Sequence, residues 1–294
     1  MTTLTTYAIV GKSESVSESI ALISPSATPF QTLVKSEKVT ARDFSWLEDS
    51  LRASSAAGLV EGADSSMTAV GQPTSRSNVT QIIGEAFQVS ATSDAITTHG
   101  RAKETARNLA KVLRQVKLDV EKSMVGVSQA AVNTNASTAR KMASIDQQIS
   151  TTLDAGSNST DPLTEAKLLS LAQTCYTNGS DPSVLMIKPA DSLIIAGFAS
   201  ASGRERDLGG SKTLVNTIDV LVTAFGTFKV VLNRENLATN AYLIDPSMFK
   251  QCVLRPFTRT LLAKTGDSDK HMVVGEVSVK HSSFADSGMI TGLS

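Results

Sequence analysis

Apolar residues recur every three or four positions through one long stretch of the chain, residues 99–132. This spacing gathers them on one face of an α-helix, which turns once in about 3.6 residues. About 34 residues at about 1.5 Å each would make a rod of roughly 50 Å. A single narrow stripe predicts one buried face, with the other sides exposed to solvent or to neighbours. The stripe consists of Ala102, Ala106, Leu109, Leu113, Val116, Val120, Met124, Val127 and Ala131.

β-prone residues flank a long polar stretch in the N-terminal third of the chain. Phe44, Trp46 and Leu47 belong to a segment that can be extended, and β-prone residues return from Val79 to Val89. Between them, residues 50–77 are dominated by Ser, Ala, Gly and Thr. A loop of this length is usually functional, so we predict a protruding two-stranded arm. Trp46 is then covered either by a neighbouring molecule or by its own domain.

Residues 162–245 alternate helical and extended patterns, as an α/β module does. A linker rich in turn residues, 150–162, precedes this module, and strands return after it. The predicted elements are helices at 164–176 and 189–198, and strands at 184–187, 215–222, 228–232, 242–244, 251–254 and 273–279.

The first 35 residues are polar apart from a few apolar positions. Val16, Ile20 and Ile23 fall at helical spacing, and we expect Pro25 and Pro29 to end that pattern. A segment with so few apolar residues cannot form its own core, so we predict an arm that docks on another surface.

Composition limits the classes of function. The 294 residues include 28 basic and 28 acidic side chains, so the whole chain is not predicted to be attracted to nucleic acid. Only 19% of residues are charged, and small polar residues of the kind that suit exposed loops are abundant. No apolar run approaches 18 residues and no secretory signal is apparent, so we expect no membrane association.

The long helix nevertheless carries a local excess of positive charge. Several of its basic residues repeat four positions apart, against only Glu104, Asp119 and Glu121. One interpretation is an ordinary solvated helix face, and the other is a basic stripe that meets acidic partners or nucleic acid. The basic residues are Arg101, Lys103, Arg107, Lys111, Arg114, Lys117 and Lys122.

No residue pattern predicts catalysis, a cofactor or a metal site. His99, His271 and His281 lack partners at the spacing of a hydrolase motif or a metal-binding helix. Residues 209–213 lack the upstream glycine of a phosphate-binding loop, and residues 266–269 lack the later ligands of a calcium loop. Cys175 and Cys252 allow one disulfide but match no metal-binding spacing, and a reducing compartment is the default expectation.

Short segments near both ends of the chain point to a family. The chain resembles tailed-bacteriophage major capsid proteins with the Hong Kong 97-type fold, both in these segments and in the order of its predicted parts. The resemblance covers nearly the whole chain, although residues 162–245 contribute only their α/β pattern. The segments are Ser-Pro-Ser-Ala-Thr-Pro-Phe at 24–30, Trp-Leu-Glu-Asp-Ser-Leu at 46–51, Leu-Arg-Pro-Phe at 254–257, Leu-Ala-Lys-Thr-Gly-Asp-Ser at 262–268 and Val-Gly-Glu at 274–276.

The resemblance implies an α+β fold with five parts. These are an N-terminal arm at 1–35, an extended loop at 36–97, the spine helix with the first part of the peripheral domain at 98–161, the axial domain at 162–245 and the second part of the peripheral domain at 246–294. Pro29, Phe30 and Trp46 are then candidate apolar anchors for pockets on neighbouring subunits.

The implied function is self-assembly as hexamers and pentamers into an icosahedral shell that encloses phage DNA, contacted without regard to sequence. Portal, scaffold or decoration proteins are further possible partners, and the location is the virion after assembly in the host cytoplasm. No Lys–Asn cross-link is expected from the extended loop, because residues 50–77 contain no lysine and Lys35 and Lys38 lie only at its base. The alternatives are another virion component, such as a tail-tube or decoration protein, and a hydrolase built on residues 162–245.

Overall fold

The computed structural model describes residues 27–52, 54, 56, 58, 61, 62, 64, 71–96, 103–133, 137–156, 161–201 and 220–293. Several sequence predictions lie outside these residues. They are the helical pattern around Val16, Ile20 and Ile23, the residues Arg101 and His99, the loop at 209–213 and the first part of the strand predicted at 215–222.

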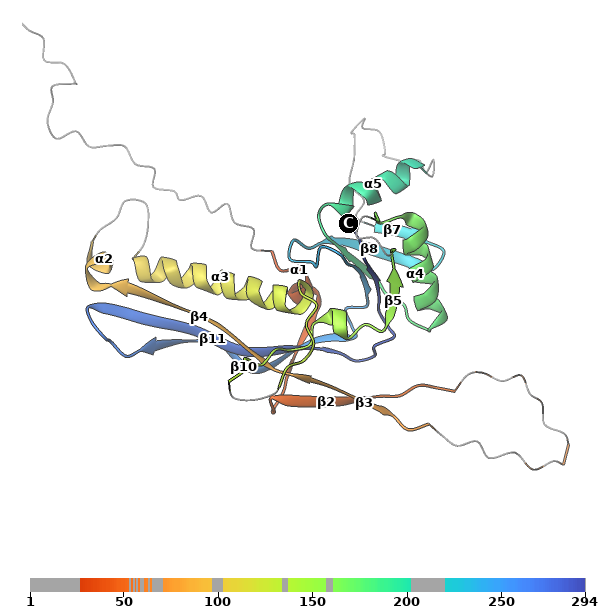
Figure 1. The fold of residues 1–294 in the computed structure, drawn as a ribbon, viewed down its shortest axis with the longest axis horizontal. Helices are drawn as coiled ribbons and strands as arrows, with labels where there is room; N and C mark the ends of the chain where they lie inside the picture. Colours follow the sequence, from red (N-terminus) through yellow and green to blue (C-terminus); the bar gives the residue numbers. More distant parts are fainter. Residues whose placement is uncertain are drawn as a thin grey trace, which may run out of the picture.

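An elongated layer forms one half of the molecule, where helix α3 (Glu104–Val125) lies along a four-stranded sheet (Figure 1). The sheet has the strand order β1 (Lys35–Lys38), β10 (Phe249–Leu262), β11 (Ser268–His281) and β4 (Gln81–Ser90). Strand β1 is parallel to β10, and the other neighbours are antiparallel. Strands β10 and β11 are much longer than predicted, because their outer halves are rich in polar and charged residues and lack a continuous apolar run.

The predicted apolar stripe is the buried face of α3. Val112, Val116, Val120 and Met124 pack with Ile83, Val273 and Val277 of the sheet in one core cluster. The helix has 22 residues, or about 33 Å at about 1.5 Å per residue, so the predicted rod of about 34 residues was too long. It ends at Gly126, where an added Cβ atom would lie 2.3 Å from the Glu235 carbonyl oxygen. This close approach of another segment leaves no room for a side chain, and the chain leaves the helix there.

A six-stranded sheet forms the other half, with the order β5 (Thr151–Asp154), β12 (Gly288–Thr291), β9 (Ala241–Ile244), β6 (Val184–Ile187), β8 (Gly226–Leu232) and β7 (Val220–Thr223). Helices α4 (Glu165–Thr177) and α5 (Asp191–Ala201) share a core cluster with one of its faces. Side chains of the other face, such as Met186 and Tyr242, join the core under α3. The predicted range of 162–245 is therefore too narrow for this sheet, which also takes in β5 and β12 from outside it.

A hairpin stem leaves the body as β2 (Asp43–Glu48) and β3 (Thr74–Val79), paired antiparallel in the register Glu48 to Thr74 (Figure 1). The predicted loop at 50–77 is therefore shorter, because residues 74–77 belong to β3. Serine favours turns and loops when judged alone, and only the pairing with β2 makes this segment a strand.

The described residues also contain α1 (Pro29–Leu33), α2 (Ala91–Ala95) and a 3-10 turn, η2 (Ile145–Gln147). Pro29 was expected to end a helical pattern, but it begins α1. Proline suits the first turn of a helix because its missing N–H would have no partner there.

Candidate assembly surfaces

A row of aromatic rings joins the N-terminal segment to the extended arm inside one chain. Phe30 packs edge-on against Phe249 with ring centroids 5.7 Å apart, and Phe249 stacks on His281 at 4.1 Å. Phe284 continues the row, 5.9 Å from His281 and 6.3 Å from Trp46. The expectation that Phe30 and Trp46 fill pockets on neighbouring subunits is therefore wrong. Phe30 is fully buried and Trp46 is only 9% exposed, each covered by its own chain.

The carboxylate of Glu121 on α3 holds the first turn of α1. Phe30 N–H donates to Oε1 at 2.8 Å and Gln31 N–H donates to Oε2 at 3.1 Å. Asn233 also donates its side-chain amide to Oε1, at 2.8 Å. Thr28, at the N-cap position, makes no capping bond with its own side chain. A glutamate about 90 positions away thus satisfies the N–H groups that an N-cap residue normally serves.

Glu121 is an isolated buried carboxylate in the described structure, with hydrogen-bond donors around it but no ion pair. Burial raises the pKa of this carboxyl group, and its hydrogen bonds offset only part of that effect. The sequence placed Glu121 among the charged residues of a solvated helix, and nothing in the local pattern indicates its role.

The stem of the extended arm is clamped by the turn that follows β11. Glu48 on β2 accepts hydrogen bonds from the Phe284 N–H at 2.9 Å and the Ser283 hydroxyl at 3.3 Å. Its other oxygen pairs with Arg76 of β3 at 2.7 Å, and the Arg76 guanidinium lies 4.4 Å from the centroid of the Phe284 ring. Burial opposes the charge on Glu48, but these partners together lower its pKa. The arm therefore leaves the body in a defined direction.

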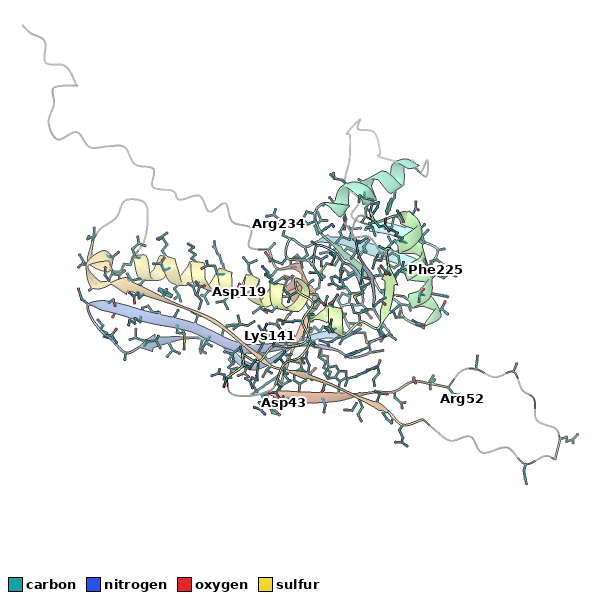
Figure 2. All side chains as sticks on the ribbon, in the orientation of Figure 1. Asp43, Arg52, Asp119, Lys141, Phe225 and Arg234 are labelled. Atoms are coloured by element: carbon teal, nitrogen blue, oxygen red, sulfur yellow. The ribbon has the colours of Figure 1, made fainter. Side chains whose placement is uncertain are left out.

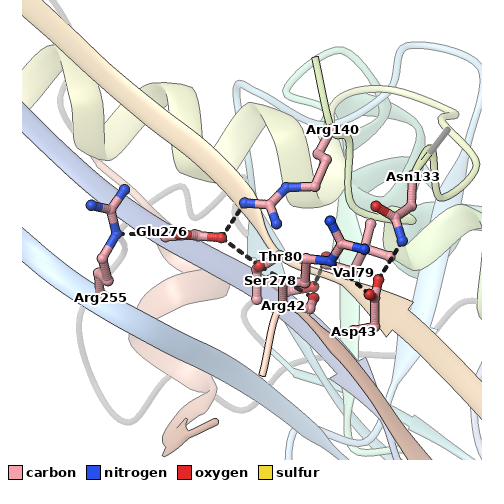
Figure 3. A network of polar contacts seen from close by, with 9 residues as sticks. All are labelled: Arg42, Asp43, Val79, Thr80, Asn133, Arg140, Arg255, Glu276 and Ser278. Atoms are coloured by element: carbon pink, nitrogen blue, oxygen red, sulfur yellow. Dashed lines mark hydrogen bonds and ion pairs between the residues drawn. The ribbon is translucent and has the colours of Figure 1, made fainter. Parts of the chain in front are cut away.

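A second polar network holds the root of the arm (Figure 3). Glu276 on β11 is buried and pairs with Arg140 and with Arg255, the latter at 3.2 Å. The Thr80 hydroxyl donates to Glu276 at 2.7 Å, and Thr80 N–H donates to the Arg42 carbonyl at 2.8 Å. The chain therefore passes from the arm into β4 at a point tied to β10 and β11.

The far side of the four-stranded sheet is not covered by α3. Cross-strand rows on this side join Ile82 to Glu276, Gly84 to Val274 and Ala86 to Met272. Ile82 is 53% exposed, although it is a large apolar side chain. We call this surface the bare sheet face, and it comprises Ile82, Gly84, Ala86, Thr258, Thr260, Met272 and Val274.

The arm carries large apolar side chains that nothing in the described chain covers. Leu47 on β2 is 70% exposed and Leu51, just beyond the stem, is 99% exposed. Arg52, the residue that follows Leu51, also projects from the arm (Figure 2). Exposed leucines at the end of a protruding stem are typical of a surface that another molecule covers.

The basic stripe predicted on the long helix lies on its exposed side. Lys103, Arg107, Lys111, Arg114 and Lys117 are exposed. Of the acidic residues that the sequence placed beside them, Glu104 and Glu121 are buried. Glu104 pairs with Arg107 at 2.8 Å.

The candidate reactive residues are held in structural roles. His281 is buried between aromatic rings, with Nδ1 3.1 Å from the Gln148 carbonyl and Nε2 3.3 Å from the Ser287 hydroxyl. Burial lowers its pKa to about 4, so the neutral ring donates to Gln148 and accepts from Ser287 at pH 7. Burial raises the pKa of Cys175 to about 11 and that of Cys252 to about 12, so both thiols stay protonated. The two cysteines are not joined in a disulfide.

Asp269, at the start of β11, pairs with Lys264 at 2.7 Å. His271 packs beside Phe87, with ring centroids 5.2 Å apart. Within the described ranges, three or more metal-ligating side chains gather nowhere in a cluster. No described helix has the length and apolar character needed to cross a membrane.

Comparison with known proteins agrees with the arrangement of these parts. The sequence profile of the family described as SU10 major capsid protein matches residues 1–294. The major capsid protein of Escherichia phage Phieco32 is 25% identical, with 95% of this chain and 94% of the relative aligned.

Solved structures share the fold at much lower identity. The structure of Microbacterium phage Oxtober96 aligns with a TM-score of 0.67 at 14% identity, covering 96% of both chains. The capsid structure of the cyanophage P-SCSP1u aligns with a TM-score of 0.64 at 10% identity, covering 96% of this chain and 92% of the other.

Proposed function

Because the chain belongs to the SU10 major capsid protein family, we propose that its extended arm links it to neighbouring copies in an icosahedral shell of hexamers and pentamers. The protein is a structural component of a phage virion, with the Hong Kong 97-type fold. The tail-tube, decoration-protein and hydrolase alternatives are not favoured by this family assignment. The observation that carries the arm's role is the protruding β2–β3 stem with its exposed leucines.

The arm has the reach to contact a neighbour. Residues 49–73 continue beyond the last paired residues of the stem, Glu48 and Thr74. A fully extended chain rises about 3.3 Å per residue, so a loop of this length has room for a reach of up to roughly 40 Å. A contact of this kind adds interface area that one compact surface lacks.

The bare sheet face is the surface that we propose for the neighbour's arm. It combines exposed Ile82 with half-buried Met272 and Val274 and exposed Thr258 and Thr260. An antiparallel sheet tolerates water on one side, but an apolar row there gains stability when it is covered. Leu47 and Leu51 supply matching apolar side chains.

The remaining parts take roles by the same reasoning. We propose that the unit around the six-stranded sheet is the axial domain and lies at the centres of the rings, and that the α3 layer is the peripheral domain. We further propose assembly in the host cytoplasm, contacts with portal, scaffold or decoration proteins, sequence-independent contact with packaged double-stranded DNA, and no catalytic activity. The proposed lack of catalytic activity is supported by the family, whose members are structural capsid proteins.

Two variants test the pairing of arm and bare sheet face. In the first, an Asn-Gly turn replaces residues 49–73 and connects Glu48 to Thr74, as in a two-residue hairpin. In the second, Ile82→Arg and Thr260→Arg add charge to the bare sheet face at exposed positions, where the fold tolerates polar side chains. We expect each variant to fold, as measured by circular dichroism, but to form no shells.

Mixing the two variants supplies the decisive control. The first variant lacks the arm but keeps an intact bare sheet face, and the second has a charged sheet face but keeps an intact arm. In the mixture, the arm of the second variant can therefore bind the bare sheet face of the first, armless variant. We expect native mass spectrometry to detect heterodimers in the mixture and only monomers in each variant alone. Shells formed by the armless variant alone, or a mixture without heterodimers, would contradict the proposed pairing.

A further inference from the structure

The exposed side of α3 presents a row of cations rather than the mixed charges of an ordinary solvated helix. Lys103, Arg107, Lys111, Arg114 and Lys117 are exposed, and at about 100° per residue they span roughly 120° of the helix circumference. The buried residues Val112, Val116 and Val120 lie on the opposite side. The row is therefore turned away from the sheet.

The structure leaves this row with one neutralising carboxylate. Glu104 is buried, and it pairs with Arg107. Glu121 falls on the same helical face as Arg114 and Lys117, but α1 covers it and its oxygens are occupied by Phe30, Gln31 and Asn233. With Glu121 buried and only Arg107 paired, the exposed surface is more basic than the sequence indicates.

Ion pairs do not use up the remaining charges. Among the residues that the structure describes, Lys103, Lys111, Arg114 and Lys117 form no salt bridge. The row stops at a groove near the end of the helix, which is lined by three carboxylates, Glu85, Asp119 and Glu235, as well as by Lys122. The cationic surface therefore has a defined length, from Lys103 to Lys117, of about 21 Å at about 1.5 Å per residue.

We infer that this row, which we call the basic face of α3, binds the phosphate backbone of the enclosed double-stranded DNA. The inference rests on the proposed function, because only a shell subunit has an inner surface that meets DNA. Duplex DNA carries about one negative charge per 1.7 Å of its axis, so phosphates outnumber the four unpaired cations of the row over this length. Lysine and arginine on a helix surface make such contacts without reading sequence.

The assignment also orients the subunit in the shell wall. The basic face of α3 and the bare sheet face lie on opposite sides of one layer, because α3 packs on the other side of the same sheet. DNA then meets α3 on the inside, and the neighbour's arm covers the sheet on the outside. Neither partner competes with the other for surface.

Fluorescence anisotropy of a labelled 30-base-pair duplex, titrated with unassembled full-length subunits over a range of NaCl concentrations, tests the assignment. The test variant combines Lys111→Gln, Arg114→Gln and Lys117→Gln, since glutamine is nearly as good a helix former as lysine and arginine. The control variant combines Lys141→Gln, Lys229→Gln and Lys264→Gln, which removes the same charge from exposed positions elsewhere.

For the wild type we expect log K to fall with log[NaCl] with a slope of about −4, from the four unpaired cations at about 0.9 each. The test variant should have a slope less steep by about 3 and should bind about 500-fold more weakly at 0.1 M NaCl. The control should match the wild type. Equal slopes in all three proteins, or no salt-dependent binding by the wild type, would overturn the assignment.

Electron microscopy of the same three proteins separates this inference from the proposed function. Shell formation by the test variant, together with its reduced slope, supports both. A test variant that forms no shells but keeps the wild-type slope would show that the row meets an acidic surface of a neighbouring subunit, and the DNA assignment would be wrong. The arm-mixing experiment does not involve α3, so its result stands apart from either outcome.

Discussion

Replacing Glu121 by alanine should loosen the attachment of the N-terminal segment to α3. The substitution removes the acceptor of the Phe30 and Gln31 backbone N–H groups and of the Asn233 side-chain amide. The Gln31 side chain also donates to Glu121, but it keeps a second acceptor in the Lys117 carbonyl at 2.8 Å. Three donors therefore lose their partner.

The size of the effect follows from burial. A buried donor without a partner costs about 1–3 kcal/mol, so three give roughly 4–5 kcal/mol when water reaches some of them. Removing the carboxylate also relieves its own desolvation, which is the cause of its raised pKa, so the net loss of stability is smaller. We expect the alanine variant to lose about 3 kcal/mol of unfolding free energy. Glutamine keeps one oxygen and should lose about half as much.

Urea unfolding followed by the fluorescence of Trp46 measures the global effect, because this is the only tryptophan and it is buried. Trypsin cleavage after Lys35 measures the local effect, since this exposed residue begins β1, two positions after the end of α1. The control is Asp119→Ala, which removes an exposed carboxylate from the same helix and should change stability by less than about 0.5 kcal/mol. Alanine and control variants that unfold at the same urea concentration and are cleaved at the same rate would refute the reasoning.

Two further predictions concern the row of aromatic rings. Glu48→Ala should release the arm stem from Phe284 and Arg76, lower stability by about 2 kcal/mol and shift Trp46 emission to the red; unchanged emission would show that the clamp does not hold the stem. His281 has a folded-state pKa of about 4, below the usual 6.5, so the unfolded chain takes up a proton first as the pH falls. Wild-type stability should therefore decline by about 1.4 kcal/mol per pH unit between pH 6.5 and 4, and His281→Gln should lose that part of the pH dependence in urea unfolding at pH 7.5 and 5. An equal decline in both proteins would contradict the assigned role of the ring.

Periodic apolar patterns allowed most elements of the body to be predicted from the sequence. The stripe through Val112, Val116, Val120 and Met124 is the buried face of α3, and the apolar run Val184–Ile187 is a buried central strand. In α3 the spacing of the apolar residues identifies the buried face, and in the strand the continuous apolar run indicates that it is buried. The end of α3 at Gly126 depends instead on a close approach by Glu235, which sequence spacing does not record.

Contacts between distant segments explain what the sequence did not reveal. Glu121 stands four positions after Lys117, so its spacing assigns it to the exposed basic row. It is buried because α1, which is distant in the sequence, covers it. Strand β3 contains Ser75, Ser77 and Asn78, which favour turns and loops, and its partner β2 lies about 30 positions earlier. Phe30 and Trp46 were expected to meet neighbours, but the ring of Phe249 and that of Phe284 cover them within the chain. The exposed anchors on the arm, Leu47 and Leu51, became visible only once burial was known.

Electron microscopy of the purified full-length protein tests the central claim most directly. A capsid subunit that builds its contacts from the arm and the bare sheet face should form closed, icosahedral shells of uniform diameter, with rings of six and five subunits in the averaged images. Open tubes or dispersed single subunits under conditions where the chain is folded would contradict the account.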